Sequence, residues 1–377
     1  MRRTTRLAAI VGASVFVVPA VAAADSLPVQ VGGEVAGKPW IDLQGIYPKK
    51  PAVHVGDTID FSIVGFHTIA VQPTGVDVLS VIVPTVPAAQ FPVTNDAAGN
   101  PFWWGGVVDA LSFNGAIFAP TPTTFDGTAL VHSGGPSPTP FSVMFTQAGT
   151  FVLACEIHPF MRGTVKVVAT GGDEDEVRPF AKQVRKGAKE LRKDARAAQK
   201  LDRKLARNTT HGDKKAGKHG RKHGHDGDGD EGHHSTKHKA KKAVVLAGAG
   251  TKRFSLLRFY PGETTVKAGD SVTWKWTGFN EVHTVTFGPD DVLAALDASL
   301  FAGPTIDPVG GLPTEAPGAP VVHSTTVHGN GLLGAGVVPD PGHNPPNTWT
   351  VQFTTPGDFN YVCLIHDGMA GVVHVTA

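Results

Sequence analysis

The sequence predicts an all-β protein built from two β-sandwiches joined by a charged linker. Short runs in which β-branched residues alternate with polar ones are bounded by glycine turns and show no helical period. The same order of strands and turns occurs in residues 45–170 and again in residues 255–377, as an internal duplication would produce. Residues 86–140 and 288–346 are rich in proline and glycine and too long for ordinary loops, so we expect irregular insertions packed over the sandwiches.

Each half is predicted to open on a hairpin and to close on a strand pair. The opening turns lie at residues 56–57 and 269–270, where Gly-Asp is flanked by alternating β-branched and polar residues. The closing pairs turn at Gly149 and Gly357, and each runs directly into a cysteine. The order of strand, glycine turn, strand and cysteine loop is therefore the same in both halves.

The linker differs from both halves in charge. Residues 171–242 contain 21 Lys and Arg against 12 Asp and Glu, whereas the flanking halves are acidic. Apolar residues at helical spacing predict a basic amphipathic helix over residues 174–207. Residues 208–242 are rich in Gly, His, Lys and Asp and cannot build a core, so disorder is expected there. A solvated spacer is the favoured interpretation, and contact of the basic helix with an anionic surface is the alternative.

The N-terminus predicts export. Three arginines within the first six residues precede an apolar stretch over residues 7–21 and a run of alanines that ends at Ala24. This pattern is typical of a secretory signal peptide, here residues 1–24. The mature chain would then consist of domains 25–170 and 243–377 around the linker. We expect it in the periplasm, at the cell surface or outside the cell.

Two matching motifs carry the chemistry of this chain. Each of its two cysteines begins a Cys-x-x-His-x-x-Met run, which places a thiolate, an imidazole and a thioether on one short loop. A histidine in a strand-like context precedes the cysteine by 88 residues in the first half (155 − 67) and by 80 in the second (363 − 283). Two imidazoles, a thiolate and a weak thioether suit a redox-active copper ion. The candidate copper ligands are His67, Cys155, His158 and Met161 in the first half and His283, Cys363, His366 and Met369 in the second.

These motifs resemble those of the blue copper proteins of the cupredoxin superfamily, the plastocyanin and azurin class. The spacing of the cysteine loops is similar to the short ligand loop of amicyanin. The resemblance implies a Greek-key sandwich in each half, one type 1 copper ion in each sandwich, and redox proteins as partners. Many members of the family place Asn directly after the upstream histidine, where its side chain ties the two ligand segments together. This chain has Thr68 and Thr284 there, and a hydroxyl can also serve as such a hydrogen-bond partner.

The function that these features favour is outer-sphere electron transfer by a blue copper protein that is not an enzyme. We expect electrons to pass through the exposed edge of His158 or His366, with Pro159 and Phe160 forming an apolar docking patch at the first site only. The two sites would then meet different partners. No nucleic-acid partner is indicated.

Two other functions stay open. Copper storage or delivery would use the seven histidines of the linker, a composition that binds metal ions loosely. A two-domain multicopper oxidase or copper nitrite reductase is less favoured, because such enzymes bind further copper through histidines adjacent to the cysteine. Ala154 and Glu156 flank the first cysteine, and Val362 and Leu364 flank the second.

Overall fold

The computed structural model describes most of both halves and the helix between them. The described residues are 25–79, 82–84, 111–113, 116, 121–134, 140–171, 176–216, 242–279, 281–288, 290, 293, 327–328, 333–335 and 348–377. The expected signal peptide and most of both Pro- and Gly-rich insertions therefore lie outside the described residues.

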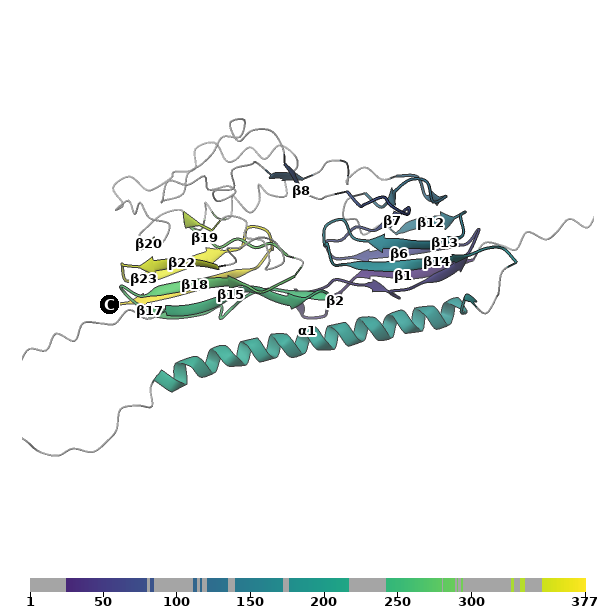
Figure 1. Cartoon of the computed structure of the whole chain (residues 1–377). Coiled ribbons are helices and arrows are strands. Elements are labelled where there is room, and N and C mark those ends of the chain that lie inside the picture. The colour runs from purple at the N-terminus through teal and green to yellow at the C-terminus, as the bar shows by residue number, and fades with distance from the viewer. Residues whose placement is uncertain are drawn as a thin grey trace, which may run out of the picture.

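The first β-sandwich consists of two five-stranded sheets (Figure 1). One sheet has the order β10 (Thr124–Phe125), β12 (Phe141–Phe145), β6 (Thr58–Val64), β1 (Ser26–Gly32) and β4 (Ile46–Tyr47). The other has the order β11 (Val131–His132), β7 (Ala70–Gln72), β13 (Gly149–Ala154), β14 (Arg162–Val168) and β5 (Ala52–His54). Burial alternates along β6, where Ile59, Phe61 and Ile63 face the core, because successive side chains of a strand point to opposite faces.

The second β-sandwich repeats this strand order. One sheet contains β20 (Val327–His328), β22 (Thr348–Phe353), β18 (Ser271–Trp276), β15 (Lys242–Thr251) and β16 (Phe254–Tyr260). The other contains β21 (Leu333–Gly334), β19 (Thr286–Phe287), β23 (Gly357–Val362), β24 (Ala370–Thr376) and β17 (Glu263–Lys267). Its core is aromatic, because Trp274 packs edge-on against both Phe287 and Tyr361. The predicted all-β fold with two sandwiches is confirmed, and the chain between them forms a long helix, as the sequence predicts.

The two sandwiches share a sheet. The hairpin of β2 (Glu34–Val35) and β3 (Lys38–Leu43) leaves the first sandwich, and β3 pairs antiparallel with β16, which gives a seven-stranded sheet. A third hydrophobic core lies at this junction, with Ile41, Leu43 and Leu256 fully buried. A small separate sheet pairs β8 (Ile82–Pro84) with β9 (Leu111–Phe113). The backbone ladder and the shared core fix the orientation of the two sandwiches.

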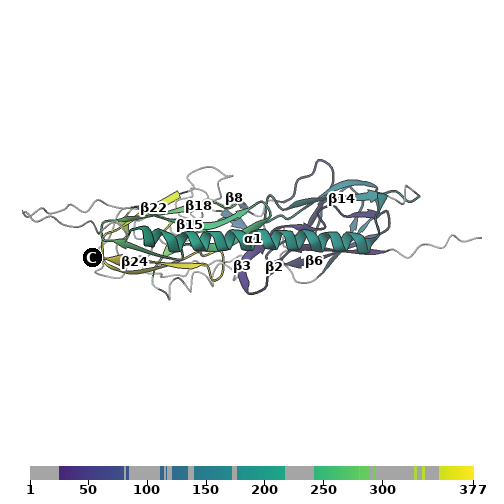
Figure 2. The ribbon, with the colours of Figure 1, turned by 90° about the horizontal axis from the view of Figure 1, so that it is seen from below.

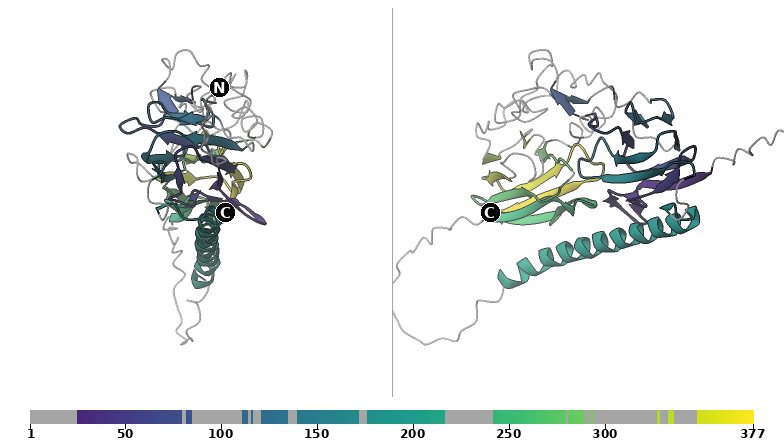
Figure 3. Two further views of the ribbon diagram at one scale, coloured as in Figure 1. Left: turned by 90° about the vertical axis from the view of Figure 1, so that its right-hand side faces the viewer. Right: turned by 45° about the vertical axis from the view of Figure 1, so that its right-hand side comes forward.

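Helix α1 (Phe180–Ala216) runs along both sandwiches on the face that carries the junction (Figures 1 and 2). Its Ala198 is fully buried in the third core, with Leu191, Leu201 and Leu205 packed against it. Interpreting this segment as a solvated spacer is therefore wrong, because the apolar face of the helix covers the junction of the two sandwiches. The helix also continues to Ala216, past the point where we expected disorder to begin. Figure 3 shows the position of the helix relative to the sandwiches in two further views.

Two buried carboxylates hold helix α1 in place. Asp194 accepts hydrogen bonds from the Tyr47 hydroxyl of the first sandwich (2.9 Å) and from Arg253 Nε of the second (2.9 Å). Asp202 accepts hydrogen bonds from the Tyr260 hydroxyl (2.8 Å), from Trp40 Nε1 (3.2 Å) and from the ammonium of Lys38. Burial raises the pKa of both tyrosines, and the next largest cause is the charge of Asp194 for Tyr47 and the hydrogen bond to Asp202 for Tyr260. Acidic residues inside a basic helix thus tie it to both halves.

Replacing Asp202 with Ala should lower the free energy of unfolding by about 2–4 kcal/mol, because each buried donor left without an acceptor costs about 1–3 kcal/mol. The donors concerned are the hydroxyl of Tyr260 and the indole N–H of Trp40. Denaturant unfolding measures the loss. Lys200→Ala, at an exposed position of the same helix, is the matched control and should change little. Equal effects of the two substitutions would contradict a bracing role for Asp202.

No helix of the described part of the chain is long and apolar enough to cross a membrane.

Candidate metal centres

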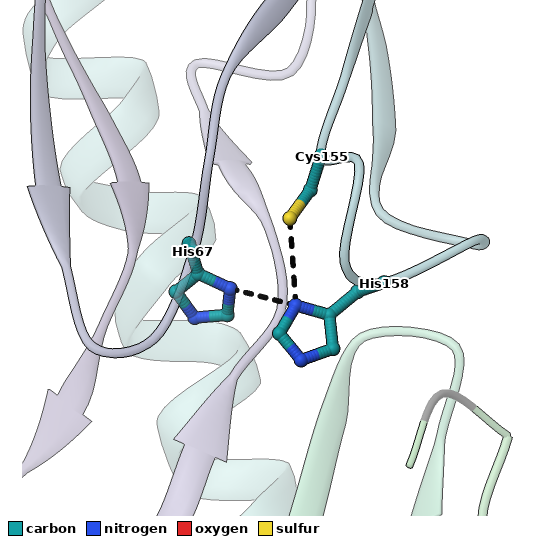
Figure 4. A group of neighbouring side chains, drawn as sticks. All are labelled: His67, Cys155 and His158. Carbon is teal, nitrogen blue, oxygen red and sulfur yellow. Dashed lines mark hydrogen bonds between the residues drawn. The ribbon is translucent and has the colours of Figure 1, made fainter. Parts of the chain in front are cut away.

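The first candidate centre lies between two loops of the first sandwich (Figure 4). The loop between β6 and β7 carries His67, and the loop between β13 and β14 carries Cys155 and His158. The Nδ1 atoms of the two histidines are 2.9 Å apart, and Cys155 Sγ is 3.5 Å from His158 Nδ1. All three side chains are buried, and their ligand atoms lie within 4.8 Å of one another.

The second candidate centre has the same construction. His283 comes from the loop between β18 and β19, and Cys363 and His366 come from the loop between β23 and β24. The two Nδ1 atoms are 3.1 Å apart, and Cys363 Sγ lies 3.9 Å from His283 Nδ1 and 3.6 Å from His366 Nδ1. This group also falls within 4.8 Å. Six of the eight residues singled out by the sequence are thus brought together in two trios.

The two methionines close the cysteine loops and are almost fully buried, each 1% exposed. Cys155 N donates to Met161 O (3.0 Å), and Met161 N donates to His158 O (2.9 Å). The corresponding hydrogen bonds in the second loop are 2.8 Å, from Cys363 N to Met369 O, and 3.1 Å, from Met369 N to the carbonyl of the loop histidine. Each loop is therefore a tight turn whose backbone holds all three of its candidate donors together.

The donor atoms of both trios fit a trigonally bound soft metal ion. Donors about 2.0 Å (nitrogen) and 2.3 Å (sulfur) from a metal, spread in a plane, lie roughly 3.5–3.7 Å apart. The measured sulfur–nitrogen distances of 3.5–3.9 Å agree with this, and the nitrogen–nitrogen distances of 2.9–3.1 Å are slightly shorter. One thiolate and two imidazoles favour copper over the harder divalent ions. The residues present therefore fit a copper ion in each sandwich.

Electrostatics keep both thiols ready to bind a metal. Burial raises the pKa of the Cys155 thiol, but the nearby imidazoles, His158 first, hold it well below its usual range. Burial likewise opposes ionisation of Cys363, and hydrogen bonds from His283 and His366 hold its pKa well below the ordinary value. The thiolate is the form of cysteine that binds metals. Both cysteines are free and buried, so both thiols are available as donors.

Two glycines make room for the upstream histidines. A Cβ atom at Gly32, the last residue of β1, would lie 2.1 Å from Cδ2 of the His67 ring. A Cβ atom at Gly248 in β15 would lie 2.2 Å from Nε2 of the His283 ring. Both glycines also have positive φ, 75° and 71°, which residues with a side chain rarely adopt. The rings thus occupy space that only glycine leaves open.

The threonines after the upstream histidines tie the two ligand loops of each centre together. Thr68 Oγ1 accepts a hydrogen bond from Glu156 N (2.8 Å), and Thr284 Oγ1 accepts one from Leu364 N (2.8 Å). The backbone N–H of each threonine also points at the cysteine sulfur, at 3.4 Å in both centres. The expectation that a threonine hydroxyl can serve as the hydrogen-bond partner between the two ligand segments is confirmed.

Thr68→Val should lower the free energy of unfolding of the metal-free protein by about 1–3 kcal/mol, because the buried N–H of Glu156 loses its acceptor. Thr68→Ser keeps the hydroxyl and should behave almost as the original protein does. Denaturant unfolding of the two variants compares them directly. If serine and valine destabilise equally, the hydrogen bond is not what holds the loops together.

Carboxylates from outside the cysteine loops contact the far side of the imidazole rings. His67 Nε2 lies 3.0 Å from Asp42 Oδ1 of β3. Glu281 stands two residues before His283 and contacts both loop histidines, with Oε1 2.9 Å from His158 Nε2 and Oε2 3.1 Å from His366 Nε2. Such partners fix the ring orientation of metal-bound histidines and leave Nδ1 as the atom facing the metal. The carboxylate of Glu281 thus joins the two centres.

The edge of His158 is not exposed, so the expected route through it to an outside partner is wrong. Its side chain is 3% exposed, and its Nε2 faces the second sandwich through Glu281. His366 is 12% exposed. A cleft of about 330 Å³ reaches the second centre and is lined by Cys363, His366 and Met369 among others. The two centres therefore differ in their access to solvent.

The carboxylates also charge the metal-free histidines. Burial lowers the pKa of His67, but the charge of Asp42 and the hydrogen bonds to Asp42 and Cys155 together raise it to about 9. Burial also opposes ionisation of His366, yet hydrogen bonds to Cys363 and Glu281 raise its pKa to about 10. The pKa of His158 is raised against burial by Glu281 and Cys155. Burial works against an ionised Glu281 too, and His158 and His366 hold its pKa well below the usual range.

Comparison with solved structures finds matches over about a third of the chain. A dithionite-reduced auracyanin from the photosynthetic bacterium Roseiflexus castenholzii is 21% identical and aligns with 37% of this chain and all of its own, at a TM-score of 0.24. A variant of amicyanin in the Cu(I) state is 18% identical over 36% of this chain and 82% of its own, at 0.21. Oxidised plastocyanin from Dryopteris crassirhizoma is 21% identical over 36% of this chain and all of its own, at 0.18. No protein-family model matches the chain, and no curated protein does.

Proposed function

We propose that this chain is an exported blue copper protein that holds one type 1 copper ion in each sandwich and transfers single electrons without binding a substrate. The observation that carries the proposal is the trio of one thiolate and two imidazoles, repeated in both sandwiches with all donor atoms within 4.8 Å. The proposed ligands are the eight residues named from the sequence, with Met161 and Met369 as the weak axial donors.

The residues around each centre keep the donor atoms in a fixed arrangement. A bound copper ion supplies a one-electron couple between Cu(I) and Cu(II). The buried loops, the threonine hydroxyls and the glycine spaces keep the donors in one arrangement, so little has to move when the charge changes. The carboxylates Asp42 and Glu281 keep the rings in the tautomer that directs Nδ1 to the metal.

The alternatives receive less support. Of the seven linker histidines only His211 lies within the described residues. An enzyme of the multicopper type would place histidines next to the cysteines, and Ala154, Glu156, Val362 and Leu364 stand there instead. We therefore propose an electron carrier rather than an enzyme, with redox proteins as its partners.

A contact with an anionic surface is also part of this proposal. Between residues 180 and 207, the outward face of helix α1 exposes only basic residues among its charged side chains. These exposed residues are Lys182, Arg185, Lys186, Lys189, Arg192, Lys193, Arg196, Lys200, Arg203, Lys204 and Arg207. Such a face attracts anionic lipid or an acidic protein and would do so less at high salt.

Visible absorption together with copper analysis tests the proposed function. The copper-loaded protein should show an intense blue charge-transfer band from Cu(II) and thiolate, lost on reduction and regained on oxidation, with one copper for each of the two trios. A colourless protein that holds copper only as Cu(I), or that binds many coppers weakly, would contradict electron transfer and favour copper handling.

Replacing Met161 or Met369 with Gln should keep copper but lower the reduction potential of that centre, because a harder oxygen donor favours Cu(II) over Cu(I). Voltammetry would be done on proteins with one working centre, so that each potential is assigned. Met144→Gln, at an exposed position of β12, is the control and should leave both potentials unchanged. An unchanged potential in Met161→Gln would exclude that methionine as the axial ligand.

A further inference from the structure

One carboxylate group lies between the two candidate copper centres. Glu281 Oε1 is 2.9 Å from His158 Nε2 of the first sandwich, and Oε2 is 3.1 Å from His366 Nε2 of the second. Each histidine presents its Nδ1 to its own centre. The path from one centre to the other therefore crosses one imidazole ring, one hydrogen bond, one carboxylate, a second hydrogen bond and a second ring.

The carboxylate is held in this position by further contacts. Gln44 Nε2 donates to Glu281 Oε1 at 2.5 Å, and Ser255 Oγ donates to the side-chain oxygen Oε1 of Gln44 at 3.2 Å. Glu281 is only 9% exposed. Gln44 follows β3 and Ser255 lies in β16, the two strands that pair across the junction. The shared sheet and helix α1 thus hold the bridge as firmly as they hold the two sandwiches.

We propose that Glu281 is an electron-transfer bridge, so that the two copper centres exchange electrons within one chain. This inference rests on the two-copper function proposed above. Electrons enter or leave at the second centre, where His366 borders the cleft. They reach the first centre through Glu281, because the edge of His158 is covered. The protein is then a two-centre relay rather than two independent carriers.

The exchange step balances without another reactant. One electron leaves Cu(I) of one centre and reduces Cu(II) of the other, so that one copper is oxidised and one is reduced. No covalent bond forms or breaks, and both Nε2–H protons stay on their rings. Each oxidised centre, counted as Cu(II), one thiolate and two neutral imidazoles, carries one positive charge. The carboxylates of Asp42 and Glu281 offset the two charges.

The same residues could be read as a third metal site, because oxygen atoms of Asp42 and Glu281 lie within 4.8 Å of a His158 nitrogen. We favour the hydrogen-bonded bridge because these atoms already have partners. Asp42 contacts His67, and each oxygen of Glu281 contacts one ring nitrogen. Copper analysis distinguishes the two: a third tightly bound ion that is lost in Glu281→Ala would overturn the bridge.

Rapid reduction of the fully oxidised, copper-loaded protein tests the bridge. All proteins would carry Met369→Gln, which separates the spectrum of the second centre from that of the first. After a brief pulse of a small inorganic reductant in less than stoichiometric amount, the second centre should be reduced first. Its electron should then pass to the first centre at a rate that does not depend on protein concentration. A rate proportional to concentration would show exchange between molecules and overturn the proposal.

Substitution of the bridge should slow this step. Glu281→Gln keeps the size of the side chain but its NH₂ group cannot accept a hydrogen bond, so one of the two links is lost. The internal rate should fall about tenfold or more, the scale on which partners of metal-bound histidines act. Gln44→Ala, which leaves the carboxylate in place but less fixed, should slow it less. Asp358→Asn is the matched control, because Asp358 also pairs with a histidine, the exposed His374, outside both trios.

The outcomes separate this inference from the proposed function. Loss of the blue band in the unsubstituted protein would refute the two-copper function itself. Two intact blue centres with unchanged potentials, and an internal rate that is the same in Glu281→Gln as in the parent, would refute the bridge alone. Potentials measured for each variant allow any change in driving force to be corrected for.

A second readout does not depend on electron transfer. In the diamagnetic Cu(I) protein, the Nε2–H protons of His158 and His366 should give NMR signals shifted far downfield and protected from exchange by their hydrogen bonds to Glu281. Glu281→Gln should move both signals, whereas Asp358→Asn should move neither. If only one signal responds, the carboxylate does not join the two rings.

Discussion

Cys155→Ser should remove one blue centre and leave the other, so that copper content and the intensity of the blue band both fall by about half. Serine keeps the shape of the side chain but cannot supply the thiolate that gives copper its soft donor and its colour. Cys363 lies in a separate sandwich with its own pair of imidazoles, so its centre should keep its copper. Absorption spectra with copper analysis of the single and double variants measure this.

The reciprocal variant is the matched control for that experiment. Cys363→Ser should leave the first centre, and the double variant should be colourless. Denaturant unfolding of the metal-free proteins should show that all three still fold. Complete loss of colour in either single variant would contradict two independent ligand sets and mean that the sandwiches share one site.

Gly32→Ala should abolish copper binding in the first sandwich, because the added Cβ would lie 2.1 Å from the His67 ring. The contact forces the ring to move by about 1 Å or more, since carbon atoms do not approach closer than roughly 3.5 Å without strain. A donor displaced by that distance can no longer complete the trio with Cys155 and His158. Copper analysis and the blue band of the Cys363→Ser background, where only the first centre is present, measure the loss.

Gly37→Ala is the control that separates crowding from backbone strain. Gly37 has φ 71°, close to the 75° of Gly32, but a Cβ atom there meets nothing within 4 Å. It should cost some stability, as a non-glycine residue at positive φ does, and should leave copper binding intact. Gly248→Ala should repeat the loss in the second sandwich. Equal copper loss in Gly37→Ala would show that strain, not the space beside His67, decides the result.

The candidate centres were accessible from sequence because most of their donors are close together in the chain. A loop of seven residues keeps its three candidate donors close together by its short length alone. Because the same loop occurs twice, Cys155 and Cys363 are predicted to have equivalent roles. The strands were equally accessible, since burial follows the two-residue period in segments such as β6. The threonine contacts could be anticipated because Thr68 adjoins His67.

The outer partners of the histidines could not be predicted in the same way. Asp42 comes from a hairpin that crosses to the other sandwich, and Glu281 contacts a histidine 123 residues earlier in the chain (281 − 158). Glu281 stands two residues before His283, where the first half has Gly65, so the repeat itself gives no sign of a bridge. The partner of His158 Nε2 therefore comes from the other sandwich, and the sequence around His158 does not reveal it.

The covered face of helix α1 is hard to predict from sequence for a related reason. Its composition is dominated by Lys and Arg, which indicates a solvated surface. However, the buried side chains Asp194, Ala198 and Asp202 recur every four residues on one face. The partners of this face, Tyr47 and Tyr260, precede prolines at matching positions of the two repeats. Nothing in the helix alone identifies them.

X-ray diffraction from crystals of the copper-loaded protein, recorded at the copper absorption edge, tests the central claim most directly. Two anomalous peaks should appear, one between Cys155 Sγ and the Nδ1 atoms of His67 and His158, and one between Cys363 Sγ and the Nδ1 atoms of His283 and His366. The carboxylate of Glu281 should lie between the two without a peak of its own. A single shared peak, or a peak among Asp42, His158 and Glu281, would contradict two copper centres joined by a carboxylate.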